Sequence, residues 1–319
     1  FKAMKIKRPE MFTQAESSRV NNIFLQILFF ILVFIVIMIA EAIVPSAMMI
    51  PKLMEYIMSD KFTGVNQEYM DFVMKIQADY KNMIATLFST VFGTIFSVIY
   101  CRFIEKRPLS SMGIIKNKAF PNYIKGMFIG LLMFSGVFIV NIIFGAVNFN
   151  GINTDLNIGI FIIYLLAWLV QGMSEEFIFR GFLMNSIGGK HGTMPAILIS
   201  AVAFSLAHIF NSGATVLSLV NIFFFGAFMS LYMIYSGNIW GVSAIHSIWN
   251  FSQGNLFGIS VSGTSSGETL FLTSSAENKD LINGGTFGAE GGIATTVILA
   301  VSFSVLFLCI YRKDKAERK

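Results

Sequence analysis

The feature that most constrains this chain is the grouping of its apolar residues into blocks of about 20. A helix of about 20 residues spans the hydrocarbon core of a bilayer, which is about 30 Å thick. Hydrophobic residues make up 55% of the 319 residues and charged residues only 13%, whereas soluble proteins carry about 25% charged residues. This composition excludes an ordinary soluble enzyme. We therefore expect a single integral membrane domain over residues 1–319, all-α in fold class.

Eight apolar blocks can be counted along the sequence. They cover residues 23–44, 83–101, 126–147, 158–179, 193–210, 215–235, 239–259 and 293–311. Each block is long enough to cross a bilayer as a helix. The sequence thus predicts a polytopic transmembrane bundle of about eight helices, which is a multi-pass membrane protein in contact with the lipid bilayer.

The placement of charge predicts how this bundle is oriented. Lysine and arginine gather before the first block, between residues 102 and 125, and after residue 311. By contrast, residues 148–157 contain one acid and no base, and residues 260–292 contain four acids and one lysine. Basic segments stay on the cytoplasmic side of a membrane, so we expect both termini to be cytoplasmic. This placement also explains the net charge of +5 without a nucleic-acid partner.

Cysteine usage and the apolar composition add a location. The chain has only Cys101 and Cys309, so no disulfide framework is expected. A chain rich in Phe and Ile and poor in cysteine is typical of a bacterial protein. We therefore expect a multi-pass protein of a bacterial plasma membrane.

Two segments between the blocks are long, and both are expected on the outer side. Residues 46–81 are predicted to form an outer loop that contains an amphipathic helix, because apolar residues between 66 and 80 fall on one helical stripe. That helix either lies on the membrane surface or covers the end of the bundle. Residues 260–292 are rich in Gly, Ser and Thr and are predicted to be an outer flexible loop.

Ionisable residues inside apolar blocks are the candidates for function, because charge at membrane depth is costly and usually faces a partner or a water-filled cavity. Glu41 lies near the outer end of its block and is expected to be structural. The remaining candidates, with one asparagine that accompanies them, are Glu175, Glu176, Arg180, His208, His246 and Asn250.

Helical spacing assigns these side chains to faces. Glu176 and Arg180 are four residues apart, with the acid first, which is the favourable order for an ion pair along a helix. Glu175 points about 100° away from Glu176. We expect one acid to be structural and the other reactive.

Two further pairs have the same spacing of four residues. His246 and Asn250 share one helical face, and Phe204 and His208 share another. A carboxylate, two imidazoles and an amide that meet in a membrane cavity can activate a water molecule and stabilise an oxyanion. That combination is suited to hydrolysis.

At these residues the sequence resembles the CPBP (CAAX protease and bacteriocin-processing, or Abi) intramembrane proteases, which are related to the type II CAAX prenyl endopeptidases. The resemblance covers residues 120–258, which we expect to be the catalytic core. It rests on three motifs in order, namely Glu175 and Glu176 followed by Arg180, Phe204 followed by His208, and His246 followed by Asn250.

The resemblance implies an intramembrane endopeptidase that acts on a membrane-associated peptide or protein. It assigns Glu175 as the base that activates water, with assistance from His208. His246 and Asn250 are then expected to stabilise the tetrahedral oxyanion.

The resemblance and the residue types give supporting roles to three other residues. Glu176 and Arg180 are expected to hold their helix in register as an ion pair. Phe204 is most simply a packing residue, with a place in the cavity wall as the alternative.

A zinc mechanism is the alternative chemistry. Glu175, His208 and His246 are the candidate ligands, because histidine and glutamate both bind zinc. The sequence contains no HExxH motif, and the Asn250 amide suits an oxyanion donor better than a zinc ligand. We therefore favour a glutamate mechanism without a metal cofactor, in a cavity at the cytoplasmic half to the centre of the bundle.

Two other classes of function remain open at this level. One is a non-catalytic membrane scaffold or bacteriocin self-immunity protein that binds a partner's transmembrane segment. The other is a transporter that uses Glu175 and the histidines as a proton relay. For a protease, the substrate is a prenylated CAAX protein, a bacteriocin leader or a pheromone precursor.

Overall fold

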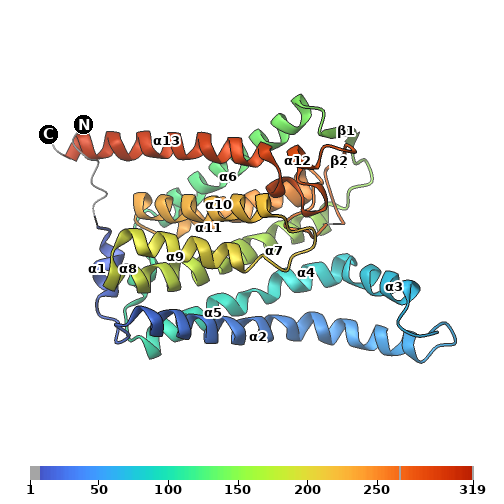
Figure 1. Cartoon of the computed structure of the whole chain (residues 1–319), viewed down its shortest axis with the longest axis horizontal. Coiled ribbons are helices and arrows are strands. Elements are labelled where there is room, and N and C mark those ends of the chain that lie inside the picture. The colour runs from blue at the N-terminus through green and yellow to red at the C-terminus, as the bar shows by residue number, and fades with distance from the viewer. Residues whose placement is uncertain (1–7, 266, 318–319) are drawn as a thin grey trace.

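The computed structural model describes residues 8–265 and 267–317, and within these residues the chain is helical apart from one short two-stranded sheet (Figure 1). Six helical segments of the described residues are long and apolar enough to cross a membrane. They are Ile23–Ile57, Tyr80–Ile104, Ala119–Ile143, Ile158–His191, Val216–Ser236 and Ile293–Ala316. The expected all-α fold and multiple apolar helices are therefore present.

Several of these segments are built from more than one element. The helices are α1 (Glu10–Ala15), α2 (Ile23–Ile57), α3 (Gln67–Gln77), α4 (Tyr80–Ser89), α5 (Val91–Ile99), α6 (Ala119–Ile143), α7 (Ile158–Glu176), α8 (Asn185–His191), α9 (Thr193–Leu206), α10 (Val216–Ser236), α11 (Trp240–Phe251), α12 (Asp280–Asn283) and α13 (Ile293–Glu317). Wider π-helical turns follow α5 at Tyr100–Ile104, α7 at Phe177–Met184 and α11 at Ser252–Leu256.

Two of the eight predicted spans are shorter than the sequence suggested. The predicted block 193–210 forms α9, which has 14 residues, and the block 239–259 begins as α11, which has 12 residues. The helix α9 ends early because the chain turns after Leu206, where the backbone N–H of His208 donates to the Ser205 carbonyl. Six segments, rather than eight, therefore meet the length of a full span within the described residues.

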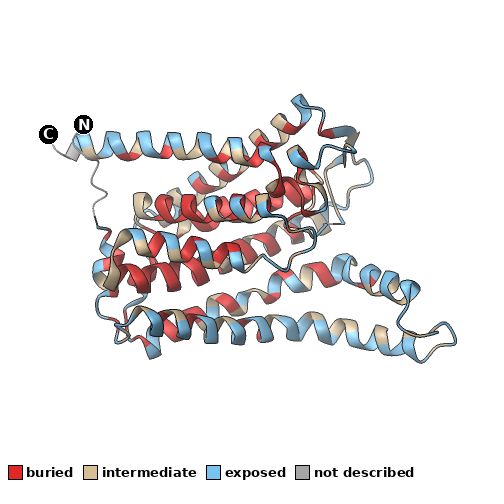
Figure 2. Ribbon diagram, in the orientation of Figure 1, coloured by how far each residue is buried: buried red, intermediate tan, exposed pale blue. Residues whose placement is uncertain are grey.

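The interior of the bundle is formed by α11 and the helices around it (Figure 2). Every residue of α11 from Gly241 to Phe251 is buried. Glycines let its neighbours approach closely: a Cβ on Gly130 of α6 would lie 2.5 Å from the Ile245 carbonyl oxygen, and a Cβ on Gly172 of α7 would lie 2.5 Å from the Ser247 nitrogen. Small residues at helix contacts are typical of membrane bundles.

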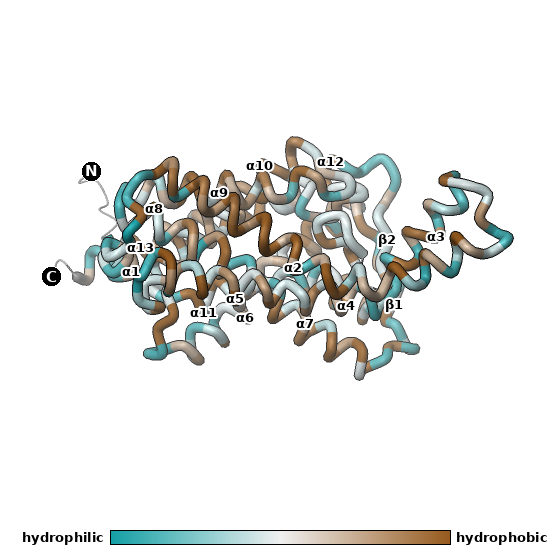
Figure 3. The backbone as a smooth tube through the Cα atoms, turned by 90° about the horizontal axis from the view of Figure 1, so that it is seen from below, coloured by the Kyte–Doolittle hydropathy of each residue, from teal (hydrophilic) through white to brown (hydrophobic). Residues whose placement is uncertain are grey.

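The outer helices have the opposite character. In the 18-residue apolar stretch of α2, and in that of α13, only 22% is buried. The large exposed residues of these helices are mostly Ile, Leu, Val, Met and Phe. Figure 3 shows long hydrophobic stretches along the helices of the bundle. Exposed apolar side chains on a helix of this length are suited to contact with lipid.

The first long segment differs in part from its prediction. The helix α2 does not stop at residue 44 but continues through Pro45 and Pro51 to Ile57, so the first part of the expected outer loop 46–81 is helical. Ala, Met, Leu and Lys between the prolines and Ile57 are strong helix formers, which favours this extension. The expected amphipathic helix is present as α3, whose buried residue is Ile76.

The second long segment, residues 260–292, contains regular elements that the prediction of a loop did not include. Strand β2 (Phe271–Ser275) pairs antiparallel with β1 (Val147–Ile152), with Val147 opposite Ser275. The short helix α12 and two 3-10 turns at Gly285–Phe287 and Ala289–Gly291 follow. We call the end of the bundle with β1, β2 and α12 the sheet end, and the opposite end with α1 and α8 the α1 end (Figure 1).

Candidate active site

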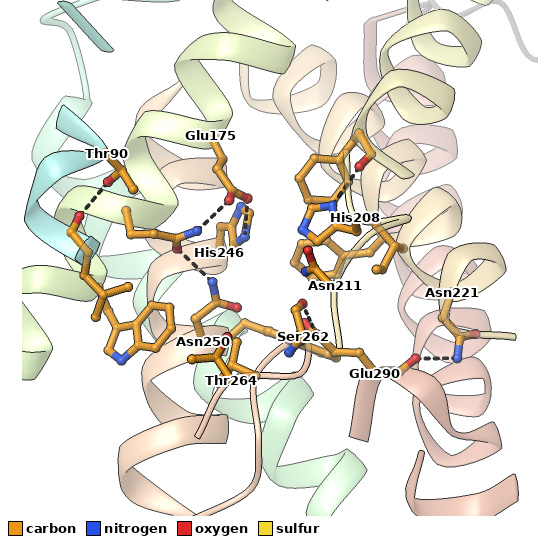
Figure 4. A pocket seen from close by; sticks show the side chains of 18 of the residues that line it. Thr90, Glu175, His208, Asn211, Asn221, His246, Asn250, Ser262, Thr264 and Glu290 are labelled. Atoms are coloured by element: carbon orange, nitrogen blue, oxygen red, sulfur yellow. Dashed lines mark hydrogen bonds and ion pairs between the residues drawn. The ribbon is translucent and has the colours of Figure 1, made fainter. Parts of the chain in front are cut away.

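A pocket of about 210 Å³ brings the four predicted catalytic residues together (Figure 4). Glu175 comes from α7, His246 and Asn250 come from α11, and His208 follows α9. The pocket is also lined by residues of α4, α10 and the segment 260–292. Residues that are far apart in the sequence therefore share one polar cavity inside the bundle.

Glu175 has one held oxygen and one free oxygen. Its Oε1 accepts a hydrogen bond of 2.6 Å from the side-chain amide of Gln171, one helical turn earlier. Its Oε2 accepts no hydrogen bond and lies 3.4 Å from Nε2 of His246. The side chain as a whole is 22% exposed, although Oε2 itself is buried against the imidazole. The carboxylate therefore borders the pocket with one oxygen fixed and the other without a hydrogen bond.

His246 lies between two carboxylates. Its Nδ1 is 2.8 Å from Oε1 of Glu176, and its Nε2 faces Glu175. Sequence spacing had placed Glu175 and Glu176 on different faces, and both nevertheless contact the same imidazole from its two sides. Glu176 therefore orients the ring in addition to its predicted part in an ion pair, as carboxylates do when they fix a histidine tautomer.

The predicted ion pair between Glu176 and Arg180 is present and fully buried, with 3.1 Å between Nη1 and Oε1. The guanidinium of Arg180 also lies 4.5 Å from the centre of the Phe204 ring. Phe204 packs in addition against the rings of His208, at 4.9 Å, and His246, at 5.8 Å. It is both a packing residue and part of the pocket wall.

Asn250 is joined to Glu175 through Gln171. The Nδ2 of Asn250 donates to Oε1 of Gln171 over 2.9 Å, and Gln171 donates to Glu175. An amide nitrogen carries two N–H groups, so Asn250 keeps a second donor. Gln171 was not among the predicted site residues, although its position four residues before Glu175 in an apolar block was a usable signal.

His208 stands on the opposite wall of the pocket from Glu175 and His246 (Figure 4). Its Nδ1 lies 2.8 Å from the Phe204 carbonyl oxygen. Since a carbonyl only accepts, Nδ1 carries a proton there, and in the neutral ring Nε2 is the acceptor. His208 thus offers a basic nitrogen across the cavity.

The wall nearest the sheet end comes from segments outside the predicted core 120–258. It includes Thr86 of α4 and Thr90, which follows α4, and in the segment 260–292 it includes Ser262, Thr264 and Glu290. An acid in a polar loop normally lies in water, so no sequence pattern placed Glu290 in the pocket.

The pocket extends from the middle of the bundle toward the sheet end. Glu175 lies midway along the helical segment Ile158–His191, and from there the lining residues lead toward the sheet end, where Ser262 and Glu290 lie. The expected place of the cavity was the cytoplasmic half to the centre of the bundle. The central position of Glu175 lies within the expected range, and the segment 260–292 adds a part of the cavity wall that the sequence did not predict.

The residues do not assemble the alternative zinc site. Within residues 8–265 and 267–317, no three His, Cys, Asp or Glu side chains lie close enough together to hold a metal ion. Glu175 and His246 are neighbours, but His208 stands across the cavity. The ligand set Glu175, His208 and His246 therefore does not fit zinc in this arrangement.

Comparison with models of known protein families gives a match to part of the chain. The family model described as type II CAAX prenyl endopeptidase Rce1-like matches residues 157–252, a range that contains all seven predicted site residues. The resemblance stated from the three motifs is thereby confirmed over this range. No curated protein and no solved structure matches the chain.

Proposed function

We propose that this chain, which carries an Rce1-like type II CAAX prenyl endopeptidase domain over residues 157–252, is an intramembrane endopeptidase that uses a glutamate to activate water. The observation that carries this proposal is how the carboxylate of Glu175 is bonded and exposed. One of its oxygens is fixed by Gln171, the other accepts no hydrogen bond and lies 3.4 Å from the His246 imidazole, and the side chain as a whole is 22% exposed to the pocket. A general base needs this combination of fixed orientation and open access.

In the proposed reaction, the carboxylate of Glu175 takes a proton from a water molecule as the water oxygen attacks the carbonyl carbon of the peptide bond. The oxyanion that forms is stabilised by the second N–H of Asn250 and by Nε2–H of His246, which in this step is the imidazolium because Nδ1–H already donates to Glu176. The proton then passes to the leaving amine as the carbon–nitrogen bond breaks, with His208 assisting from the opposite wall. The water is thus divided between the new carboxylate and the new amine.

The supporting residues hold this arrangement. Glu176 accepts hydrogen bonds from both Arg180 and His246, so it connects α7 to α11. Phe204 fills the space between Arg180 and the two histidines. Their proposed role is to position the reacting groups.

For the orientation we propose eight membrane-crossing segments with both termini in the cytoplasm of a bacterium. In addition to the six long segments, α9 and α11 would cross as shorter helices. The basic residues near the α1 end and the acidic segment 260–292 support this orientation. The pocket then extends toward the outer side of the plasma membrane.

The proposed substrate is a membrane-associated peptide or protein. The candidates are a prenylated CAAX protein, a bacteriocin leader and a pheromone precursor, and an outward-facing pocket favours the two exported classes. The second candidate function is a scaffold or bacteriocin self-immunity protein that holds a partner's transmembrane segment. A scaffold has no requirement for a free Glu175 oxygen.

A comparison of secreted and membrane-bound peptides by mass spectrometry tests the proposal in cells. We expect the Glu175→Gln variant to accumulate the same uncleaved peptides as a deletion strain. Glu277→Gln, an exposed acid outside the pocket, should match the unmodified protein. If Glu175→Gln also matches the unmodified protein while the deletion differs, the scaffold function is correct.

A further inference from the structure

We propose that Glu290 binds a positively charged group of the substrate, so that the protein acts on peptides with a lysine, an arginine or a free amino terminus near the cleaved bond. This inference rests on the proposed function, because it names the substrate class of the same pocket. Glu290 lies outside the residues that match the family model, which end at residue 252.

The Glu290 side chain is held in place in the pocket wall. Its Oε1 accepts a hydrogen bond of 3.1 Å from Nε1 of Trp249, and its Oε2 accepts from both the backbone N–H and the hydroxyl of Ser262. Its backbone carbonyl accepts from the side-chain amide of Asn221. All these neighbours are neutral donors, so they fix the carboxylate and leave its charge uncompensated.

The charged side chains of the pocket wall are therefore mainly acidic. Glu175 and Glu290 both line it, whereas the buried Glu176 is paired with Arg180. Among the residues that the structure describes, no lysine or arginine lines the cavity. The basic side chains of the lining are His208 and His246, and His246 is held between Glu175 and Glu176. Glu290 has no cationic partner among the described residues, and such a carboxylate attracts positive groups and repels a terminal carboxylate.

The geometry also gives this charge a place along the substrate. Glu175 lies midway along its helix, and Glu290 belongs to the segment at the sheet end. A peptide that enters from the sheet end passes Glu290 before its peptide bond reaches Glu175. Glu290 is thus suited to select the charge of a residue on the outer side of the cleaved bond.

A test of pocket charge needs no cleavage. A single cysteine at Thr264, an exposed residue of the pocket wall, is introduced into protein with Cys309→Ser, and the buried Cys101 is retained. Purified protein is treated at low salt with methanethiosulfonate reagents that carry either a trimethylammonium or a sulfonate group. We expect the cationic reagent to react faster, and Glu290→Gln to lower the ratio of the two rates by about fivefold or more.

The matched control is Glu277→Gln, which removes an exposed acid from the same segment and should leave the ratio unchanged. Protein without the Thr264→Cys substitution should react with neither of the two reagents. An equal ratio in Glu290→Gln and in the parent protein overturns the inference.

A second measurement tests the binding of a cation directly. Nα-acetyl-lysine methylamide, which keeps its side-chain ammonium, should slow the reaction of the cysteine at position 264 with neutral N-ethylmaleimide. The uncharged Nα-acetyl-norleucine methylamide should not slow it. Glu290→Gln should remove this protection. Equal protection by the two amides contradicts the inference, whereas absence of peptide cleavage in cells contradicts only the proposed function.

Discussion

At the scale of single residues, two adjacent glutamates have different roles in the site because they make different hydrogen bonds. Glu175 is held through one oxygen only, while Glu176 is buried and bonded to Arg180 and His246. The same residue type therefore serves as a proposed reactive group at one position and as a positioning group at the next. The difference comes from the faces of α7 that the two side chains occupy.

Glu176→Gln should cost stability as well as rate. The amide cannot balance the charge of Arg180, which is fully buried, and loss of one partner of a buried ion pair costs about 3 kcal/mol or more. The midpoint of thermal unfolding in detergent should fall, whereas Glu277→Gln should leave it unchanged. An unaltered midpoint in Glu176→Gln would show that the pair contributes nothing to the fold.

The prediction that the protein binds no zinc also depends on single residues. Because His208 stands apart from Glu175 and His246, purified protein should contain much less than one zinc ion per chain by elemental analysis. Activity should persist after treatment with a chelator and dialysis. One zinc ion per chain that is lost in His246→Ala, with activity restored by added zinc, would reverse this prediction.

The residue types in the site could be predicted from the sequence, because charged and polar residues in apolar blocks are rare and their spacing assigns faces. The contacts across helices could not. Neither the sharing of His246 by two glutamates nor the link from Asn250 through Gln171 follows from spacing along one helix. These contacts depend on how closely α7 and α11 pack.

At the scale of elements, that packing depends on glycines facing α11. Gly130→Ala should destabilise the bundle, because the new Cβ would lie 2.5 Å from the Ile245 carbonyl oxygen, and overpacking costs about 1–3 kcal/mol. Gly136 on the same helix is the matched control, since its Cβ would meet the flexible end of Ile298.

The measurement compares the midpoints of thermal unfolding of Gly130→Ala, Gly136→Ala and the unmodified protein. Gly136→Ala should be neutral or stabilising, because alanine favours a helix by up to about 1 kcal/mol over glycine. A midpoint in Gly130→Ala that equals or exceeds that of Gly136→Ala would mean that α6 and α11 are not in close contact.

Element boundaries show what hydropathy alone does not determine. It locates the apolar blocks, but α2 continues past two prolines and α9 stops after 14 residues. The pairing of β1 with β2 joins segments more than 100 residues apart, which is about the scale of a whole domain, and no local pattern predicts such a partner.

At the scale of the whole molecule, the account depends on which end of the bundle faces outward. A single cysteine at Asn278, in the exposed part of the segment 260–292, should react with a membrane-impermeant thiol reagent in intact cells. A cysteine at Lys116, in the basic connection before α6, should react only after the cells are permeabilised. The opposite pattern would place the pocket on the cytoplasmic side.

The central claim is that Glu175 activates water for peptide hydrolysis, and single-turnover cleavage by purified protein in liposomes tests it most directly. The substrate is a peptide found to accumulate in the deletion strain. We predict that Glu175→Gln lowers the rate of cleavage by about 100-fold or more while the midpoint of thermal unfolding stays within the error of the unmodified protein. Cleavage by folded Glu175→Gln at the unmodified rate would contradict the account.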